Sequence, residues 1–188
     1  VGRTYDSDVI RINSQSGRGG VSYVLKNSFG LILPDKMKEE VGYLMKNVSD
    51  HRHAELSPED MRDVFKETYV DVDKKFDVSE CHFKQKDGIG AEVTIVADGK
   101  ETVVDSHGNG RLNAVNHAIK KYFNLDYALD VYEEHSLSKR SDAQAISYVG
   151  IKPAGQEKLY WGAGTDDDII KSSIDALVNA VNRYMENK

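Results

Sequence analysis

The spacing of hydrophobic residues along the chain changes near residue 72. Before that point, apolar residues recur at the intervals of an amphipathic helix, first over residues 34–47 and again after Ser57. Ser57 is a good N-cap residue, a proline follows it, and Asp60 supplies an acid three residues on. With a polar loop expected at residues 50–55, residues 34–71 are predicted to form a small helical subdomain.

Beyond residue 72, alternating apolar and polar residues predict strands. Asp98 and Gly99 separate two such runs and predict a tight hairpin turn. Gly108 and Gly110 then lead into an amphipathic helix. The expected elements are strands at residues 78–86, 91–97 and 101–105 and a helix at residues 111–123.

The same order of elements is repeated in the rest of the chain. Strands are expected at residues 127–136, 143–152 and 157–161, and a second G-x-G follows at Gly162 and Gly164. A helix is predicted from Thr165 to about Met185, with Thr165 and Asp168 as its capping box. The pattern therefore predicts an α+β fold of two βββα units, at about 72–125 and 126–188. Each unit leaves an apolar sheet face that one helix only partly covers, so the two units are expected to bury those faces against each other.

Residues 1–33 have the least regular pattern of the chain. The stretch RINSQSGRGG, residues 11–20, is rich in serine and glycine and is interpreted as a flexible linker. The chain begins with Val1, and the residues that follow lack the layout of a signal peptide. We therefore expect it to be a piece of a longer or processed protein.

Charge and composition narrow the classes of function. The net charge is −6 and the pI about 5.5, which opposes a general affinity for nucleic acid or anionic membranes. No apolar run approaches the roughly 18 residues that a membrane helix needs. Cys81 is the only cysteine, which excludes an internal disulfide and a cysteine-based zinc site and suits a reducing cytoplasm.

The glycine pairs do not match the common nucleotide-binding loops. The P-loop string is absent, and the third glycine of a dinucleotide fingerprint is replaced by Asn113 and Asp167. Two interpretations remain: the glycines only permit a tight turn, or the amides at the helix N-terminus receive a small carboxylate. Small or apolar residues that could line a pocket for a short aliphatic side chain are Leu112, Leu129, Ala143 and Ala145.

Other candidate chemistry is weak. His51, His53 and Glu55 lie in a polar stretch, where solvated side chains are commoner than metal ligands. Glu134 and His135 are neighbours in a predicted strand, so they are expected to point to opposite faces. The residues alone assign no catalytic group and no metal ligand.

Four segments make the sequence similar to a known family. They are GRTYDSDVIRINSQSGRGGVSYVLKNSFGLILP (residues 2–34), HGNGRLNAVNHA, YEEHSLSKRSDAQAISYV and YWGAG. Together they resemble the linker and C-terminal regulatory region of 2-isopropylmalate synthase. The resemblance is to the longer form of this leucine-biosynthetic enzyme, found in actinobacteria, many other bacteria and fungi. It implies a parent enzyme that condenses acetyl-CoA with 2-oxoisovalerate in a metal-dependent barrel before Val1.

The resemblance also implies what this chain does. It is expected to bind L-leucine for feedback inhibition, to form a homodimer with leucine at the interface, and to work on the catalytic barrel of the same protein. It should need no cofactor and be inactive alone. Tyr5 matches a linker tyrosine associated with the family's active site and its regulation. The implied effector-binding residues are Gly108, Gly110, Leu112, Asn113, Leu129, Tyr132, Ser136, Ala143, Ala145 and Thr165.

Three residues depart from the family pattern and keep alternatives open. Arg111 replaces a frequent proline, and Asn113 and Ser136 stand where the family often has alanine. A more polar pocket would weaken leucine binding or shift its preference. The alternatives are a purely structural dimerisation domain whose effector site has decayed, and an isoleucine-sensing domain of a citramalate synthase relative.

Overall fold

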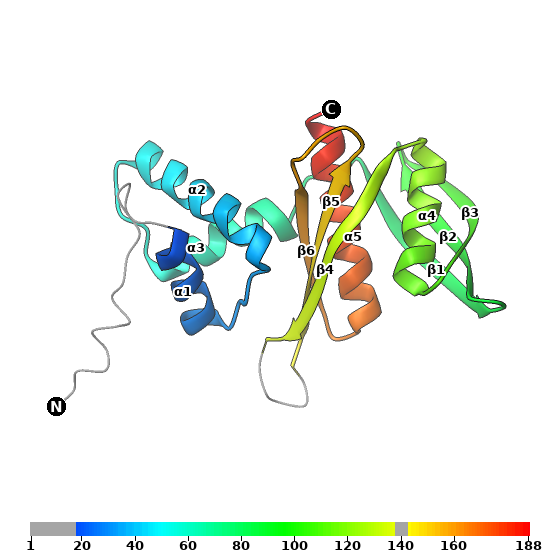
Figure 1. Ribbon diagram of the computed structural model, residues 1–188, viewed down its shortest axis with the longest axis horizontal. Helices are drawn as coiled ribbons and strands as arrows, with labels where there is room; N and C mark the ends of the chain where they lie inside the picture. The colour runs from blue at the N-terminus through cyan, green and yellow to red at the C-terminus, as the bar shows by residue number, and fades with distance from the viewer. Residues whose placement is uncertain (1–17, 138–142) are drawn as a thin grey trace. The chain divides into compact units, whose positions relative to one another are not determined.

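The computed structural model describes residues 18–137 and 143–188. The chain divides into two compact units: Val1–Thr68 with Leu137–Lys139, and Tyr69–Ser136 with Arg140–Lys188. We call them the helical unit and the sheet unit, and their elements are drawn in Figure 1. The predictions about Tyr5 and about most of the serine- and glycine-rich stretch concern residues outside the described part.

The helical unit contains one helix more than the pattern predicted. Its elements are α1 (Arg18–Phe29), α2 (Asp35–Arg52) and α3 (Pro58–Phe65), and the π-helix η2 (Lys66–Val70) continues α3 across the boundary into the sheet unit. The prediction of an irregular linker is wrong for α1, where Val21, Val24 and Leu25 are buried at helical spacing. Burial of this face outweighs the low helix propensity of Gly19 and Gly20.

The helix boundaries in this unit follow from their caps. In α3 the predicted capping box is confirmed: Asp60 N donates to Ser57 Oγ at 3.1 Å, and Ser57 N donates to Asp60 Oδ2 at 3.0 Å. In contrast, α2 continues to Arg52 through part of the predicted loop, and it ends where His53 adopts the left-handed conformation, with φ of 52°. The polar residues 50–52 are thus an exposed last helical turn.

Replacing Ser57 by alanine is expected to lower the free energy of unfolding of the helical unit by about 1 kcal/mol, because the Asp60 amide loses its acceptor. Urea unfolding followed by circular dichroism would measure the change. Asp63→Ala is the matched control, since it removes an exposed carboxylate from the same helix. Equal stability of Ser57→Ala and Asp63→Ala would contradict the role given to the cap.

The sheet unit has the predicted α+β class and the predicted duplication. Two antiparallel three-stranded sheets have the strand orders β1-β2-β3 and β4-β5-β6, and each is followed by one helix. The elements are β1 (Phe76–Gln85), β2 (Ile89–Ala97), β3 (Lys100–Gly108), α4 (Arg111–Phe123), β4 (Tyr127–Ser136), β5 (Ala145–Pro153), β6 (Tyr160–Asp166) and α5 (Ile169–Glu186). We call β1–α4 the first module and β4–α5 the second module.

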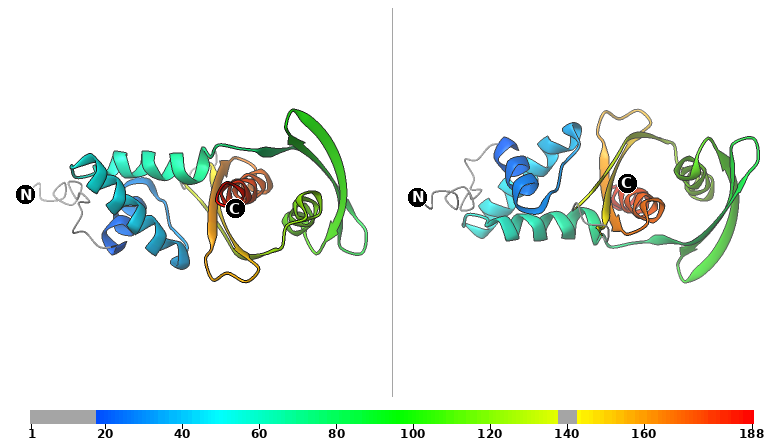
Figure 2. Two further views of the ribbon diagram at one scale, coloured as in Figure 1. Left: turned by 90° about the horizontal axis from the view of Figure 1, so that it is seen from above. Right: turned by 90° about the horizontal axis from the view of Figure 1, so that it is seen from below.

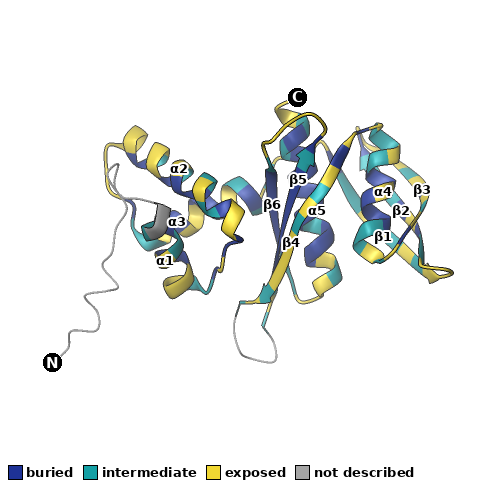
Figure 3. Cartoon of the chain, in the orientation of Figure 1, coloured by how far each residue is buried: buried dark blue, intermediate teal, exposed yellow. Residues whose placement is uncertain are grey.

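The two helices of the sheet unit lie between its two sheets (Figure 2). One hydrophobic core joins both modules, and it includes Val93 and Ile119 of the first and Ile151 and Leu177 of the second. The edge strand β4 is mostly exposed beyond its first residue (Figure 3). The sheets therefore bury their apolar faces within one unit, as the unit pattern predicted.

The second G-x-G is part of a strand, so its prediction as a loop is wrong. Gly162 and Gly164 lie within β6 and face α5, where a Cβ at Gly164 would come 2.8 Å from the amide nitrogen of Ala176. The predicted helix start and capping box at Thr165 are also wrong. The helix begins at Ile169, and Asp168 caps it by accepting from Ile170 N at 2.8 Å. These glycines permit close helix–strand packing rather than a turn.

Candidate functional site

The first part of the candidate site is the N-terminus of α4, where β3 ends. Gly110 is the N-cap residue and has no side chain to cap the helix. Asn113 points its side chain back across the loop, and its Oδ1 accepts from Asn109 N at 3.0 Å. The first-turn amides of α4 thus carry the positive end of the helix dipole without a capping oxygen from the N-cap side chain.

The two glycines of this loop have different roles. A Cβ at Gly108 would overlap Asn113 Oδ1 and lie 2.6 Å from Ala114 N, so Gly108 is required for the loop to fold against α4. Gly110 is extended, with φ of −152° and ψ of 179°, and a Cβ there would meet nothing within 4 Å. The backbone conformation therefore does not require glycine at position 110, and the space beside it is open.

The second part of the candidate site lies on the face of the β4-β5-β6 sheet that packs against α5. Ser136 pairs with Ala145 and Tyr132 with Val149. A β-bulge between Leu129 and Val131 adds one residue, so that Leu129 and Tyr132 share this face although they are three residues apart. Ala143 lies just before β5 and is half-buried.

Thr165 is on the other face of the same sheet. It pairs with Ile146, which neighbours Ala145 in β5, and adjacent residues of a strand point to opposite faces. Of the ten predicted residues, four therefore belong to the end of β3 and the start of α4. Five belong to β4, to β5 or to the residues just before β5, and Thr165 belongs to β6.

A cluster of hydroxyl groups connects this sheet face to the first turns of α5. The Tyr132 hydroxyl lies 2.6 Å from Ser173 Oγ, and Ser147 Oγ lies 2.8 Å from Ser172 Oγ and 3.3 Å from Ser173 Oγ. The three serines are buried, whereas Tyr132 is 39% exposed. The cluster thus reaches from the protein interior to a residue at the surface.

Tyr132 is also the donor to a carboxylate at the rim of this cluster. Its hydroxyl donates to Glu134 of the same strand. Partial burial and this hydrogen bond raise the pKa of the Tyr132 phenol, so it stays protonated at neutral pH. Apolar periodicity alone does not reveal these serines, although two adjacent serines on the apolar face of a predicted helix are a signal that the sequence contains.

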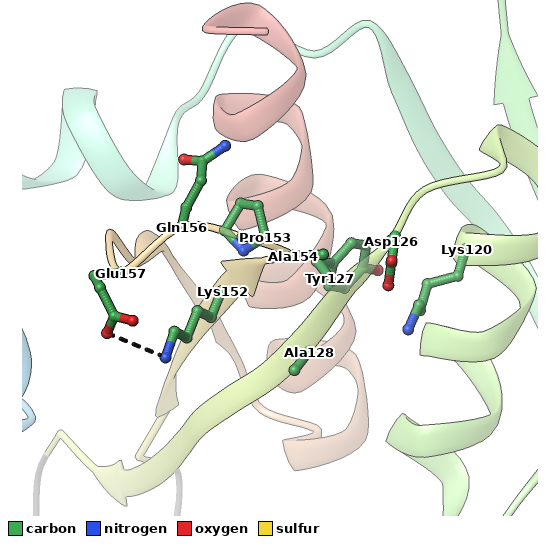
Figure 4. A pocket seen from close by; sticks show the side chains of 10 residues that line it. Lys120, Asp126, Tyr127, Ala128, Lys152, Pro153, Ala154, Gln156 and Glu157 are labelled. Atoms are coloured by element: carbon green, nitrogen blue, oxygen red, sulfur yellow. Dashed lines mark ion pairs between the residues drawn. The ribbon is translucent and has the colours of Figure 1, made fainter.

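A separate groove of about 560 Å³ lies at the other end of the β4–β5 ladder (Figure 4). None of the ten predicted residues lines it. Lys152 pairs with Glu157 at 3.3 Å, and Lys120 Nζ lies 5.2 Å from the centre of the Tyr127 ring. The groove is lined by Lys120, Asp126, Tyr127, Ala128, Lys152, Pro153, Ala154, Gly155, Gln156 and Glu157.

Two of the other candidate residues, His51 and His135, have local partners. His51 Nδ1 lies 2.8 Å from Asn47 O, and His135 Nε2 lies 2.9 Å from the Tyr148 hydroxyl. Within residues 18–137 and 143–188, no group of three or more histidine, cysteine or acidic side chains could hold a metal ion. No helix in those same ranges is both long and apolar enough to cross a membrane. Burial raises the pKa of the Cys81 thiol to about 11, which makes it a poor nucleophile.

The duplicated βββα unit with one shared core is a domain of the α+β class. The family described as "LeuA allosteric (dimerisation) domain" matches residues 55–185, and the chain belongs to this family. A second family, "Alpha-isopropylmalate synthase, post-catalytic domain-like", matches residues 1–26. The chain is thus an allosteric and dimerisation domain of the 2-isopropylmalate synthase type, as the resemblance implied.

Curated relatives agree with this assignment. The chain is 41% identical over 188 residues to the 2-isopropylmalate synthase of Desulfitobacterium hafniense, covering 100% of this chain and 33% of the relative. It is 41% identical to the 2-isopropylmalate synthase of Helicobacter hepaticus, covering 98% of this chain and 34% of the relative. A Mycobacterium ulcerans enzyme of the same name is 37% identical, covering 97% and 33%. The chain spans about a third of the length of these relatives.

Proposed function

We propose that this chain binds L-leucine and thereby mediates feedback inhibition of a 2-isopropylmalate synthase, as a homodimer. The observation that carries the proposal is the family match over residues 55–185, which spans both modules and both parts of the candidate site. Condensation of acetyl-CoA with 2-oxoisovalerate, with its divalent metal, is assigned to the barrel of the parent protein. The parent enzyme is further proposed to be the longer form of this synthase.

The proposed site places the leucine carboxylate at the N-terminus of α4. A helix N-terminus carries about half a positive charge, and the open space beside Gly110 allows a carboxylate to approach. The aliphatic side chain is assigned to Leu112, Leu129, Ala143 and Ala145. Thr165 lies on the other sheet face, so any contact from it would come from its main chain.

The two parts of this site belong to different modules. The first module contains the glycine loop and the start of α4, where Asn113 bonds Asn109. The second module contains Tyr132, which bonds Ser173. A symmetric dimer can bring such surfaces of two chains together. We therefore place the leucine site at the interface of the proposed homodimer.

Titration calorimetry with leucine, isoleucine and valine tests this function directly. Preferential binding of leucine supports the proposal, and preferential binding of isoleucine supports the citramalate synthase alternative. A chain that sediments as a dimer but binds none of the three is the structural dimerisation domain. A chain that sediments only as a monomer at tens of micromolar contradicts the dimer.

Gly110→Val is expected to weaken leucine binding at least about tenfold, or by about 1.4 kcal/mol, because its side chain would fill the approach to the α4 amides. The fold should be unaffected, since φ is −152° and the space is empty within 4 Å. Calorimetry measures the affinity, and urea unfolding checks the fold. Asp63→Ala, in the helical unit, is the control with unchanged affinity. If Gly110→Val binds leucine with wild-type affinity, the leucine carboxylate does not bind at the N-terminus of α4.

A further inference from the structure

The C-terminal half of α5 holds the chain segment that leads into β1. Asn182 Oδ1 accepts from Lys75 N at 2.7 Å and from Phe76 N at 3.2 Å, and its Nδ2 donates to Phe76 O at 3.0 Å. One turn earlier, Asn179 Nδ2 donates to Val70 O at 2.9 Å. Both asparagines are only 1% exposed. The two ends of segment 70–76 are thus fastened to a single helix.

A third side chain of α5 holds Tyr69, the residue just before residues 70–76. We call Tyr69 and these residues together segment 69–76. The Arg183 guanidinium carbon lies 4.6 Å from the centre of the Tyr69 ring and the group donates to Trp161 O of β6 at 2.8 Å. Tyr69 belongs to η2, a π-helix that spans the boundary between the two units. Single π-turns of this kind are frequent at functional sites. The connection from the helical unit therefore enters the sheet unit through contacts with α5.

The N-terminal half of the same helix contacts the proposed leucine site. Ser173 Oγ lies 2.6 Å from both the Tyr132 hydroxyl and Ile169 O, which belongs to the first turn of α5. Beside it, Ser172 and Ser147 join α5 to β5. A ligand that changes the position of Tyr132 would therefore act on the first turn of α5.

α5 has the stiffness needed to connect these two sets of contacts. It contains no glycine or proline over its 18 residues, and its only serines, Ser172 and Ser173, lie before the stretch that leads from Ser173 to Asn182. Gly162 and Gly164 bring its backbone into direct contact with β6. Ser173 and Asn182 are separated by about 14 Å along the helix axis, which a rigid helix spans without a hinge.

We propose that α5 transmits leucine binding from Tyr132 to segment 69–76, with Ser173 as the positioning residue at one end and Asn179, Asn182 and Arg183 at the other. This inference rests on the proposed leucine binding. A small shift of α5 as one body moves both ends together, because helices in packed cores shift by discrete steps rather than bend. The connection to the helical unit thereby becomes the element that leucine regulates.

Amide hydrogen exchange of the full 188-residue chain tests this proposal without any mutation. Saturating leucine is expected to slow exchange at Lys75 and Phe76, whose amides bind Asn182 Oδ1, by about threefold or more. The Gln156 amide, bonded to Pro153 O in the turn after β5, at the other end of the β4–β5 ladder from Ser136 and Ala145, is the internal control with no change. Calorimetry on the same sample separates the two failures. Absence of leucine binding overturns the proposed function, and binding without a change at Lys75 and Phe76 overturns the role of α5.

A variant then tests the route. Ser173→Ala removes the hydroxyl that joins Tyr132 to α5, and at saturating leucine it should lose more than about half of the protection gained at Lys75 and Phe76. Ser106→Ala is the matched control, because it removes a similar hydroxyl-to-carbonyl bond, to Ala114 O, in the first module. A full wild-type response in Ser173→Ala contradicts this route. If Ser173 only stabilised the fold, Ser173→Ala would change the free energy of unfolding equally with and without leucine.

Discussion

Gly162→Ala is expected to destabilise the sheet unit by about 3 kcal/mol or more, the upper range for overpacking a core. The added Cβ would overlap the Ala180 amide nitrogen and the Ala176 carbonyl oxygen and would lie 2.9 Å from Ala180 Cα. These are backbone atoms of α5, so no side-chain rotation relieves the overlap. The helix would have to move away from β6 and open the core around Leu177 and Val178.

Urea unfolding monitored by the fluorescence of the single tryptophan, Trp161, which is 1% exposed, would measure this loss. Gly110→Ala is the matched control, because a Cβ there meets nothing within 4 Å, and its stability should stay within about 0.5 kcal/mol of wild type. Gly164→Ala should behave like Gly162→Ala. Wild-type stability of both β6 variants would disprove the direct packing of α5 on β6.

The two G-x-G pairs show which parts of the fold could be predicted from local sequence and which could not. The bounds of α4 and β4 and the capping box of α3 match their predictions: the glycine loop precedes α4, a left-handed Asn124 ends it before β4, and Ser57 with Asp60 caps α3. The second pair looks like the first, but there the strand continues through both glycines to Asp166. The cause is tertiary: whether glycine serves a turn or a close approach depends on the position of α5, which no local pattern specifies.

The candidate site shows the same limit at the level of single residues. Leu129 and Tyr132 are three residues apart and should face opposite sides of a regular strand, yet the bulge places them on one face. Thr165 pairs with Ile146 rather than with Ala145, so its side chain points to the opposite face of the sheet from Leu129, Tyr132 and Ala145. The serines at 147, 172 and 173 are polar and buried, so a search for apolar periodicity leaves them out.

The glycine loop at α4 can now be divided by function. Gly108 is needed for the fold, because Asn113 and Ala114 occupy the space where its side chain would be. Gly110 is not needed for the fold, so a substitution there changes the approach to the α4 amides without changing the structure around them. This separation makes position 110 the sharper test of the proposed carboxylate site.

The sheet unit is expected to lose stability steeply above pH 10 through Tyr127. This tyrosine is 2% exposed, and its hydroxyl donates to Asn116 Oδ1 at 2.6 Å. Burial raises the pKa of its phenol well above the ordinary value of 10.0. The folded state therefore keeps a proton that the unfolded state releases, so the stabilisation is complete below pH 10 and is lost as the pH rises towards the folded-state pKa. The loss is about 1.4 kcal/mol for each pH unit.

Tyr127→Phe separates this effect from general alkaline damage. At pH 8 the variant should be less stable than wild type by about 1–3 kcal/mol, because the buried Asn116 Oδ1 loses its donor. Above pH 10 the variant has no phenol to titrate at this position, so the difference should shrink by about 1.4 kcal/mol per pH unit and then reverse. Urea unfolding of both proteins from pH 8 to about pH 12 would follow the two curves across the expected window. Parallel curves throughout that range would mean that the Tyr127 phenol titrates alike in the folded and unfolded chain, which would contradict its burial against α4.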